Sequence, residues 1–556
     1  MRKSDRTLLP AVILILMVTG ALMLMVVTSL MDPAGTVGLT LTHYRRLLEN
    51  PAFWPNTLYS LYLAVAASLL ATVAGTLTAY SIATSENAAV RRLSERVMQA
   101  GLVLPYLYAV FLAFLLLGQA GLLSRLALAL GVIDSQVSFP VLIFDPAALG
   151  MIWVYAFKGI PFVTLMTLTI MTRINRQYQG VARTLGAGGL QQLLRIYLPL
   201  SRRVILWSSL VLFAYALGSF EVPHFMSAFT PRPLAASLYS LYLRPGLSSY
   251  YEAMAQGILM LVFGTAAAGV YLGALNRLLK STLNVRGNRF RAGPRFAPVW
   301  LTVLSALWLI PMGYVVLYSF FAAIPFPELL PSQFSLQFWE NTLLRNTLFG
   351  PALYTSVQLA VFTGLITTAL GMMAARSLSR MKRHTSLSWF ALISLPLFVP
   401  AMILMLSLHL LMLRFSLANS KTAVLLAHVI ISLPYATAIL TAYFKGIGTG
   451  LEETAKTLGC TPFHYYRKLL LPLMMPGLFF SFCIGFLLSF SELFSVLLLG
   501  GGNVLTFSML MYPAMTNSQW GTGAVMGTLF LLIHLGLFLL ADRWVRRSLS
   551  GTDYLF

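Results

Sequence analysis

Two carboxylates in this sequence lie inside apolar stretches, where a charge is expensive. Glu221 and Glu492 follow Pro199 and Pro472 by 22 and 20 residues. A charge in the middle of a bilayer costs about 3 kcal/mol on insertion scales, so such residues mark solute pathways by default. We therefore treat both as candidate pathway residues, together with Lys158. The alternatives are carboxylates that are capped by backbone or paired with a base, and a lysine that pairs with an acid or extends toward the interface.

Other chemistry is not indicated. The two cysteines form no CxxC pair and no Cys/His cluster appears, so no metal site is expected. The sequence contains no Gly-Lys dipeptide and hence no phosphate-binding loop of the G-x4-G-K-[ST] type. His409 and His428 are expected to be hydrogen-bonded core residues. No catalytic dyad is evident, so the chain is not expected to be an enzyme.

The composition indicates a membrane protein. Of the 556 residues 58% are hydrophobic and 10% charged, against roughly 25% charged in a soluble domain. Twelve stretches approach the 20 or so apolar residues that a span needs, and we expect an all-α polytopic fold. The predicted spans are Leu8–Leu30, Thr57–Thr84, Met98–Gly118, Ala147–Met171, Val204–Val222, Ala253–Leu275, Val299–Phe320, Pro351–Ala375, Leu387–Leu413, Ala423–Phe444, Met475–Leu499 and Gly521–Ala541. The first is too long for a signal peptide and is expected to be retained.

Positive charges are distributed unevenly between these spans. The N-terminus and every second loop hold 29 of the 38 lysines and arginines. Loops rich in Lys and Arg stay in the cytoplasm, so both termini are predicted to be cytoplasmic. The net charge of +22 therefore reflects topology, and no nucleic-acid partner is expected.

The chain repeats itself. Ser60, Gly75 and Ala79 recur as Ser356, Gly371 and Ala375, 296 residues later, and later positions recur at an offset of 273. Each repeat has six predicted helices, and six is even, so the two repeats are parallel. We predict a first unit at 1–275, a basic linker at 276–298 and a second unit at 299–556. Such repeats usually enclose a pathway.

The loop between the fourth and fifth spans is the most informative part of each repeat. These segments are called the first loop (172–203) and the second loop (445–474). In the second loop we expect two short helices, with Gly459 in the left-handed conformation that ends one helix and Thr461-Pro462 starting the next. Phe463, Tyr466 and Leu470 then form an apolar stripe.

The first loop is built in the same way. Its stripe consists of Leu190, Leu193, Leu194 and Tyr197. A short amphipathic helix in a loop fits a partner's groove, and the alternative is a helix on the lipid surface. Two such loops at equivalent positions favour a partner that is present twice.

The second loop resembles the EAA loop of type I binding-protein-dependent ABC importer permeases. The matching residues are Glu453, Ala455, Gly459, Leu469, Leu471 and Pro472 at the family's spacing. The first loop matches through Ala182, Gly186, Ile196, Leu198 and Pro199, but has Gly180 where the glutamate belongs. That departure puts an acidic contact of the first loop in doubt.

This resemblance implies a mechanism and partners. Two copies of an ATP-binding cassette ATPase would dock on the loops and carry the ATP and Mg²⁺, and a periplasmic or extracellular solute-binding protein would deliver the solute. The protein would lie in a bacterial inner membrane. Two units in one chain resemble the ferric-iron and thiamine permeases, which makes either solute a candidate.

A secondary transporter with two six-helix halves is the alternative. The major facilitator family would show a G-x3-D-x2-G-[RK] loop after its second helix. The loops that begin at Ser85 and Ser377 do not fit that pattern.

Overall fold

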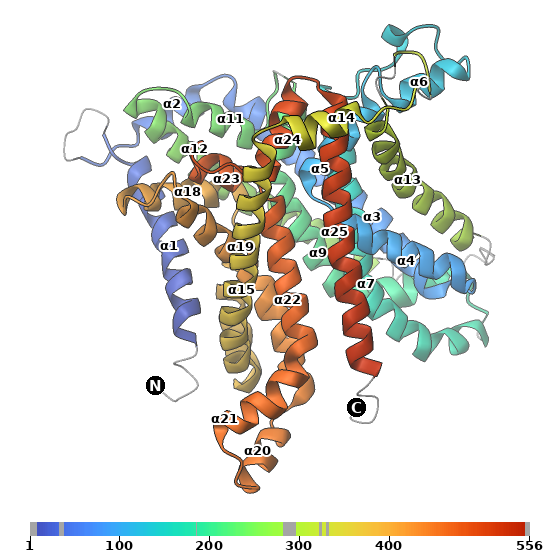
Figure 1. The fold of residues 1–556 in the computed structure, drawn as a ribbon, viewed down its shortest axis with the longest axis vertical. Helices are drawn as coiled ribbons and strands as arrows, with labels where there is room; N and C mark the ends of the chain where they lie inside the picture. The colour runs from blue at the N-terminus through green and yellow to red at the C-terminus, as the bar shows by residue number, and fades with distance from the viewer. Residues whose placement is uncertain are drawn as a thin grey trace. The chain divides into compact units, whose positions relative to one another are not determined.

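The structure is a computed structural model, which describes residues 8–32, 38–184, 186–228, 230–281, 296–321, 325–329 and 333–550. Within these residues the chain is built from helices (Figure 1). No β-strand occurs in the part that the structure describes, apart from the isolated bridges of Met31 with Leu39 and of Phe321 with Phe334. The predicted all-α fold is confirmed.

Eleven helices of the described chain are long and apolar enough to cross a membrane. They are Leu9–Ser29, Phe53–Thr84, Tyr106–Ala129, Leu149–Asn175, Gly189–Gly218, Leu247–Lys280, Ala297–Ser319, Phe349–Arg380, Lys421–Ile447, Pro462–Ser491 and Trp520–Trp544. The chain is therefore a multi-pass membrane protein. The predicted span that is not among the eleven is Leu387–Leu413.

Prolines explain that difference. The stretch Leu387–Leu413 is divided among helices α16 to α18, and the longest, α18 (Ala401–Arg414), has 14 residues. Val399 is extended (ψ 129°) before Pro400, because a proline disfavours the helical conformation of the residue before it. The predicted span Met98–Gly118 is divided at Pro105 in the same way. A continuous helix was the wrong prediction at both places.

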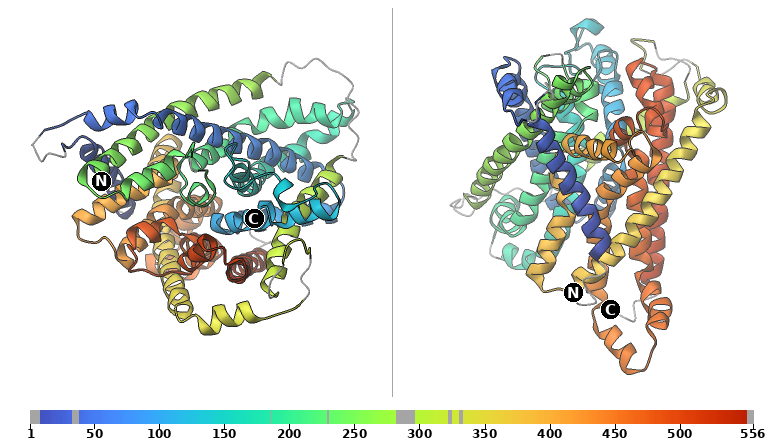
Figure 2. Two further views of the ribbon diagram at one scale, coloured as in Figure 1. Left: turned by 90° about the horizontal axis from the view of Figure 1, so that it is seen from above. Right: turned by 90° about the vertical axis from the view of Figure 1, so that its left-hand side faces the viewer.

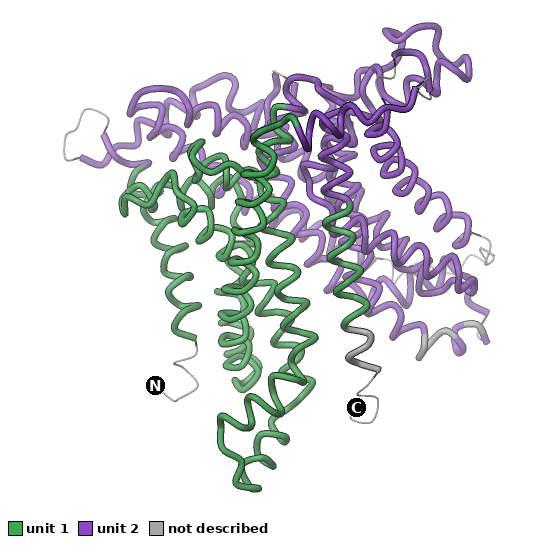
Figure 3. The backbone as a smooth tube through the Cα atoms, in the orientation of Figure 1, with its two compact units in different colours: residues 1–28, 345–513, 532–556 green, residues 29–344, 514–531 purple. Residues whose placement is uncertain are grey.

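The first compact unit is not the first predicted repeat, since most of it comes from the second. It contains residues Met1–Thr28, Arg345–Pro513 and Leu532–Phe556 (Figure 3). Its helices are α1 (Leu9–Ser29), α15 (Phe349–Arg380), α16 (Arg383–Ile393), α17 (Leu395–Phe398), α18, α19 (Lys421–Ile447), α20 (Gly450–Thr457), α21 (Pro462–His464), the π-helix η6 (Tyr465–Leu470), α22 (Leu471–Ser491), α23 (Phe494–Leu499), most of α24 (Phe507–Thr516) and the end of α25 (Trp520–Ser550). Helices α15, α19 and α22 pack side by side at its centre (Figures 1 and 2).

The second compact unit contains residues Ser29–Leu344 and Ala514–Leu531. Its helices are α2 (Thr42–Glu49), α3 (Phe53–Thr84), α4 (Ala88–Val103), α5 (Tyr106–Leu117), α6 (Leu122–Ala129), η2 (Gln136–Ser138), α7 (Leu149–Thr184), α8 (Gly189–Gln192), the π-helix η3 (Leu193–Tyr197), α9 (Leu198–Gly218), α10 (Glu221–Met226), α11 (Leu234–Tyr242), α12 (Leu247–Ser281), α13 (Phe296–Ser319), α14 (Gln337–Glu340), most of the π-helix η5 (Asn341–Arg345) and the start of α25. Helices α3, α7 and α9 form its centre, and they are the repeat equivalents of α15, α19 and α22.

The compact units and the sequence repeat divide the chain differently. Helix α1, from the first repeat, groups with the central helices of the second repeat, and α13, from the second repeat, groups with those of the first. The boundaries 1–275, 276–298 and 299–556 describe the repeat and stay a prediction. Residues 282–295 of the linker lie outside the described residues.

Close packing of the second and fourth spans is repeated in both units. A Cβ atom placed on Gly75 of α3 would lie 2.7 Å from Val163 Cβ on α7. The equivalent atom on Gly371 of α15 would lie 2.8 Å from Ala436 Cβ on α19. Small residues let helix backbones approach closely in membranes, where packing drives association.

Hydroxyl pairs join the second and fifth spans in the same repeated manner. Thr72 Oγ1 donates to Ser209 Oγ at 2.8 Å, and Thr368 Oγ1 donates to Ser481 Oγ at 3.2 Å. These contacts fix the central helices from which both loops extend.

Candidate functional site

The second loop has the predicted helix–break–helix form. Helix α20 ends at Thr457, and Gly459 follows with φ of +71°. Its N–H donates to Lys456 O at 3.0 Å, and the N–H of Cys460 donates to Ala455 O at 2.9 Å, as in a helix C-cap. Thr461 then caps α21 by accepting from the N–H of His464. The predicted conformation of Gly459 is confirmed.

The first loop shares the glycine turn and the short helix after it, but the expectation of a separate short helix before the turn is wrong there, because α7 runs without a break from the fourth span to Thr184. Helix α7 reaches Thr184, and Gly186 has φ of +73°. Helix α8 then begins at Gly189, and the side chain of Gln191 accepts from the N–H of Gly188 at 3.3 Å. Both loops therefore turn at a left-handed glycine before a short helix.

Each short helix continues through a π-helical turn into the fifth span of its repeat. The turns are η3 and η6, at equivalent positions, and they lead directly into α9 and α22. Pro199 and Pro472 occupy early positions of those spans, directly after the π-helical turns. A proline has no N–H to donate, so it interrupts the hydrogen bonding of a continuous helix at that place. Each loop is thus joined to a membrane-spanning helix by continuous helical backbone that carries a π-helical turn and a proline.

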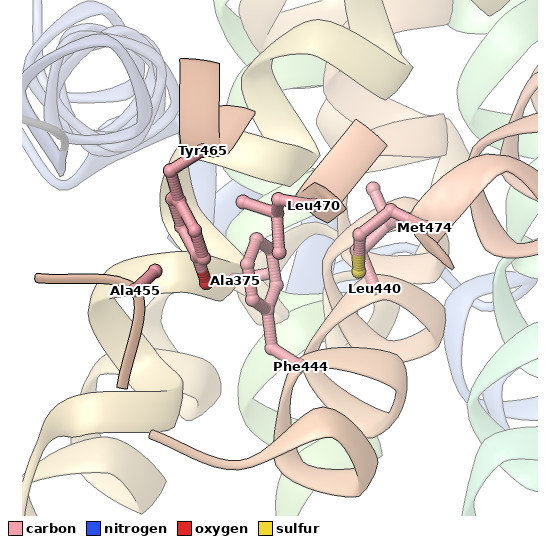
Figure 4. Close-up of a cluster of buried hydrophobic side chains, with 7 residues drawn as sticks. All are labelled: Ala375, Leu440, Phe444, Ala455, Tyr465, Leu470 and Met474. Carbon is pink, nitrogen blue, oxygen red and sulfur yellow. The ribbon is translucent and has the colours of Figure 1, made fainter. Parts of the chain in front are cut away.

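A cluster of buried apolar side chains packs the second loop against the central helices of its compact unit (Figure 4). Ala455, Tyr465 and Leu470 come from the loop and are buried. They pack against Ala375 of α15, Leu440 and Phe444 of α19, and Met474 of α22. These buried side chains of the loop therefore pack against helices of the same chain.

The outer face of the second loop carries large apolar side chains in the open. Leu458 is 79% exposed and Phe463 is 71% exposed, and Glu453 of the same loop is also exposed. The predicted stripe is corrected in one respect, because Phe463 points outward while Leu470 is buried and Tyr466 is half-buried. The π-helical turn, with more residues per turn than an α-helix, separates their directions.

The first loop shows the same division between an inner and an outer face. Ala182, Leu193 and Tyr197 are buried, and Leu190, at the repeat position of Phe463, is 41% exposed. Two further predicted residues follow this division, Leu194 being half-buried and Gly180 exposed.

Ion pairs at the second loop involve the glutamate next to the one in the motif. Glu452 pairs with Arg376 and Arg380 at the end of α15 and with Lys456. Sequence reasoning did not predict this contact. The only local signal was the spacing of the two arginines, four residues apart on one helix face.

The candidate pathway carboxylates each lie at the start of a short helix. Glu492 separates α22 from α23, and its Oε2 accepts from Ser495 Oγ at 2.8 Å and from the Ser495 N–H at 3.3 Å. Oε1 of Glu492 has no hydrogen bond within the described residues. Glu221 is the first residue of α10 and is partly exposed. The alternative interpretation, a carboxylate that is capped by the backbone, therefore holds for one of the two carboxylate oxygens of Glu492.

His428 belongs to the network behind that cap. Its Nε2 lies 2.8 Å from Ser495 Oγ and its Nδ1 lies 2.7 Å from Ser489 Oγ. The expectation of a hydrogen-bonded core histidine is confirmed.

Lys158 has a partner that the sequence did not suggest. Its ammonium donates to the carbonyls of Gly101, at 3.1 Å, of Leu102, at 2.8 Å, and of Leu104. It also lies 5.5 Å from the ring centre of Tyr106. These carbonyls end helix α4 where Pro105 interrupts the chain, so Lys158 satisfies the acceptors that the break leaves open.

Comparison with known families identifies a match that occurs twice. The family model described as "binding-protein-dependent transport system inner membrane component" matches residues 71–285 and again residues 367–550. The first match lies mostly in the first predicted repeat and continues into the predicted linker, and the second match lies within the second predicted repeat.

Several curated proteins are similar over parts of the chain. A probable ABC transporter permease protein of Sinorhizobium fredii is 23% identical over 59% of this chain and 59% of its own length. The putrescine transport system permease protein of Escherichia coli is 28% identical over 32% of this chain and 65% of its own length. A glucose import system permease protein of Saccharolobus solfataricus is 26% identical over 45% of this chain and 91% of its own length. The match thus spans less than two thirds of the first two relatives.

Proposed function

The chain belongs to the family of binding-protein-dependent transport system inner membrane components, and on that premise we propose that it is the membrane subunit of an ATP-driven importer. Both permease repeats lie in this one chain, so a single copy supplies the complete set of membrane helices. The proposed solute pathway is enclosed by the two repeats, as is usual for parallel repeats in transporters.

The observation that carries this proposal is the duplicated loop. Gly186 and Gly459 hold the same conformation, and Leu190 and Phe463 are exposed at equivalent positions. A short helix with an exposed apolar side chain suits a groove on a partner. The occurrence of two such loops supports a partner in two copies, one for each loop.

The proposed partner is an ATP-binding cassette ATPase that carries ATP and Mg²⁺. Binding of ATP draws the two ATPase copies together, and each pulls the loop that it holds. Since each loop continues into α9 or α22 without a break in the helical backbone, the movement reaches the fifth span of each repeat. ATP hydrolysis then returns the spans to their starting position. This chain contributes no cofactor of its own.

The proposed location is the inner membrane of a bacterium. The loops and both termini face the cytoplasm, following the basic residues, and a solute-binding protein docks on the opposite side. A phosphatase reporter fused near Arg291 should be inactive, and one near Gly501 should be active. The reverse pattern would contradict this orientation.

The proposed solute is a cation, with ferric iron and thiamine as the first candidates. Names of its relatives include ferric and putrescine transport systems, but also glucose and sulfate systems. Glu221 and Glu492, one in each repeat, would favour a positive solute in the pathway. A carboxylate 4 Å from a cation contributes about 4 kcal/mol at an effective dielectric constant of 20.

Reconstitution tests the function and separates it from the alternative. The full chain, placed in proteoliposomes with its ATPase and solute-binding protein, should take up solute only when ATP and all three components are present. Uptake by the chain alone, driven by an ion gradient, would show a secondary transporter and overturn the proposal.

A further inference from the structure

A group of charged side chains joins the second loop to the end of α15, and we call it the ionic latch (Arg376, Arg380, Glu452 and Lys456). Oε2 of Glu452 bonds to the guanidinium of Arg380, and Oε1 lies 3.8 Å from Arg376 Nη2 and 2.9 Å from Lys456 Nζ. The Glu452 side chain is 14% exposed, and that of Lys456 is 69% exposed. Shielded arginine–carboxylate pairs are the stronger kind, whereas exposed lysine pairs contribute little. The two arginines therefore dominate the latch.

Arg376 contacts both arms of the second loop. Its Cζ lies 4.7 Å from the ring centre of Tyr466 in η6, within cation–π range. It also approaches Glu452 in α20. One arginine thus links the helix before Gly459 and the helix after it to the same point on α15.

Uncharged groups take part in the equivalent junction of the first loop. Tyr80 of α3, at the repeat position of Arg376, donates to Gly189 O at 2.7 Å, and its ring lies edge-on to that of Tyr197 at 4.9 Å. The hydroxyl of Tyr197 donates to Asn175 Oδ1 at 2.7 Å. At this one position the two repeats thus use different side chains, a tyrosine in the first and an arginine in the second.

A cavity of about 270 Å³ lies beneath the second loop. It is lined by parts of α15, α19, α20 and η6, including Arg380, Glu452 and Tyr465. The loop is thus not packed against its unit over its whole length. Its position depends on the apolar cluster of Figure 4 and on the ionic latch.

We propose that Arg376 and Arg380 are positioning residues that set the orientation of the second loop through Glu452. The latch holds α20 and η6 so that Glu453 and Phe463 face outward together. The second loop is therefore sensitive to charge reversal at these arginines and to salt. The role in coupling rests on the proposed function, but the latch itself is a property of this chain alone.

The native cysteines give a readout that needs no partner. Cys460 lies in the second loop and is partly buried against the apolar cluster. Cys483 is buried in α22. In the purified full chain, Arg380→Gln should raise the rate of maleimide labelling at Cys460 about fivefold, as expected for loss of a partly shielded pair. Labelling at Cys483 should stay slow, which shows that the unit remains folded.

Two matched variants serve as controls for this experiment. Lys382→Gln removes a neighbouring exposed charge, and Tyr80→Phe breaks the junction of the first loop. Neither should change the labelling of Cys460. An unchanged rate in Arg380→Gln with folding intact would overturn the latch, and so would an equal rise in Lys382→Gln.

Exchanging the charges of the latch distinguishes a role in positioning the second loop from a general contribution to the stability of the fold. Arg380→Glu should raise Cys460 labelling and increase the ATP hydrolysed per solute imported. Combining Glu452→Arg with both Arg376→Glu and Arg380→Glu should restore both values to within about twofold of wild type, because the charges on α15 and α20 attract again and only the exposed Lys456 is left without its partner. Failure of the exchange to restore either value would contradict the proposal. If the wild-type chain bound no ATPase at all, the proposed function would be wrong. The labelling of Cys460 would still show whether the ionic latch positions the second loop.

Discussion

Substitution of Gly459 tests the geometry of the second loop through the backbone alone. The φ of +71° lies in the left-handed region, which costs an L-residue about 1–2 kcal/mol. No atom of the rest of the chain lies within 4 Å of a Cβ added there, so the cost is conformational and not a clash. Asparagine tolerates this region, alanine does so less well, and a β-branched residue is an outlier in it.

The binding of the ATPase should follow that order. A cost of 1.4 kcal/mol is about tenfold in an equilibrium constant. We expect ATPase binding to weaken about twofold in Gly459→Asn, about fivefold in Gly459→Ala and about tenfold or more in Gly459→Val. Transport should be lost in Gly459→Val while insertion in the membrane is kept.

Gly186 offers the matched position in the first loop. Its φ of +73° and its open surroundings are the same, so Gly186→Val carries an equal backbone cost. It should nevertheless do less harm, because the first loop has Gly180 in place of the motif glutamate and contributes less to docking.

The assay titrates the ATPase onto each purified full-length variant and also measures stimulation of ATP hydrolysis. Thermal unfolding serves as the control for folding. Equal binding and stimulation in wild type and Gly459→Val would refute the coupling role of the second loop. Equal damage in Gly459→Asn and Gly459→Val would refute the conformational reasoning.

Three further predictions concern the membrane region. Glu221→Gln combined with Glu492→Gln should slow uptake while ATPase docking and folding stay unchanged, and unchanged uptake would leave the pathway role of these residues without support. Gly371→Ala should lower the free energy of unfolding by about 1–3 kcal/mol through overpacking. Adding Ala436→Gly should restore part of that loss, because the closest contact is removed while the backbone of α19 stays near; no rescue at all would contradict the close approach of α15 and α19. Lys158→Met should lower stability by about 1–3 kcal/mol, since the carbonyls at the end of α4 lose their donor, with ATPase docking unchanged; unaltered thermal unfolding would show that this contact is dispensable.

Local chemistry was predictable from the sequence. The left-handed conformation of Gly459 and the cap at Thr461 follow from residue types at neighbouring positions. The spans follow from runs of apolar residues, and the repeat follows from constant offsets. The conformations and the spans need information from about one helix length only, and the repeat needs only a comparison of the chain with itself.

Long-range pairing was not predictable from the sequence. Glu452 meets Arg380 across 72 positions, and Lys158 meets the end of α4 across more than 50. Nothing in either residue's neighbourhood specifies which helix lies beside it. The exposed position of Phe463 was missed for a different reason, because a π-helical turn changes the periodicity on which the stripe was based.

The mass of the intact complex tests the central claim most directly. Native mass spectrometry of the chain, purified with its ATPase in a nucleotide-bound state, should show one copy of the chain with two copies of the ATPase. Complexes that hold one ATPase per chain, or a chain that remains free of ATPase, would contradict a role for both loops as docking sites.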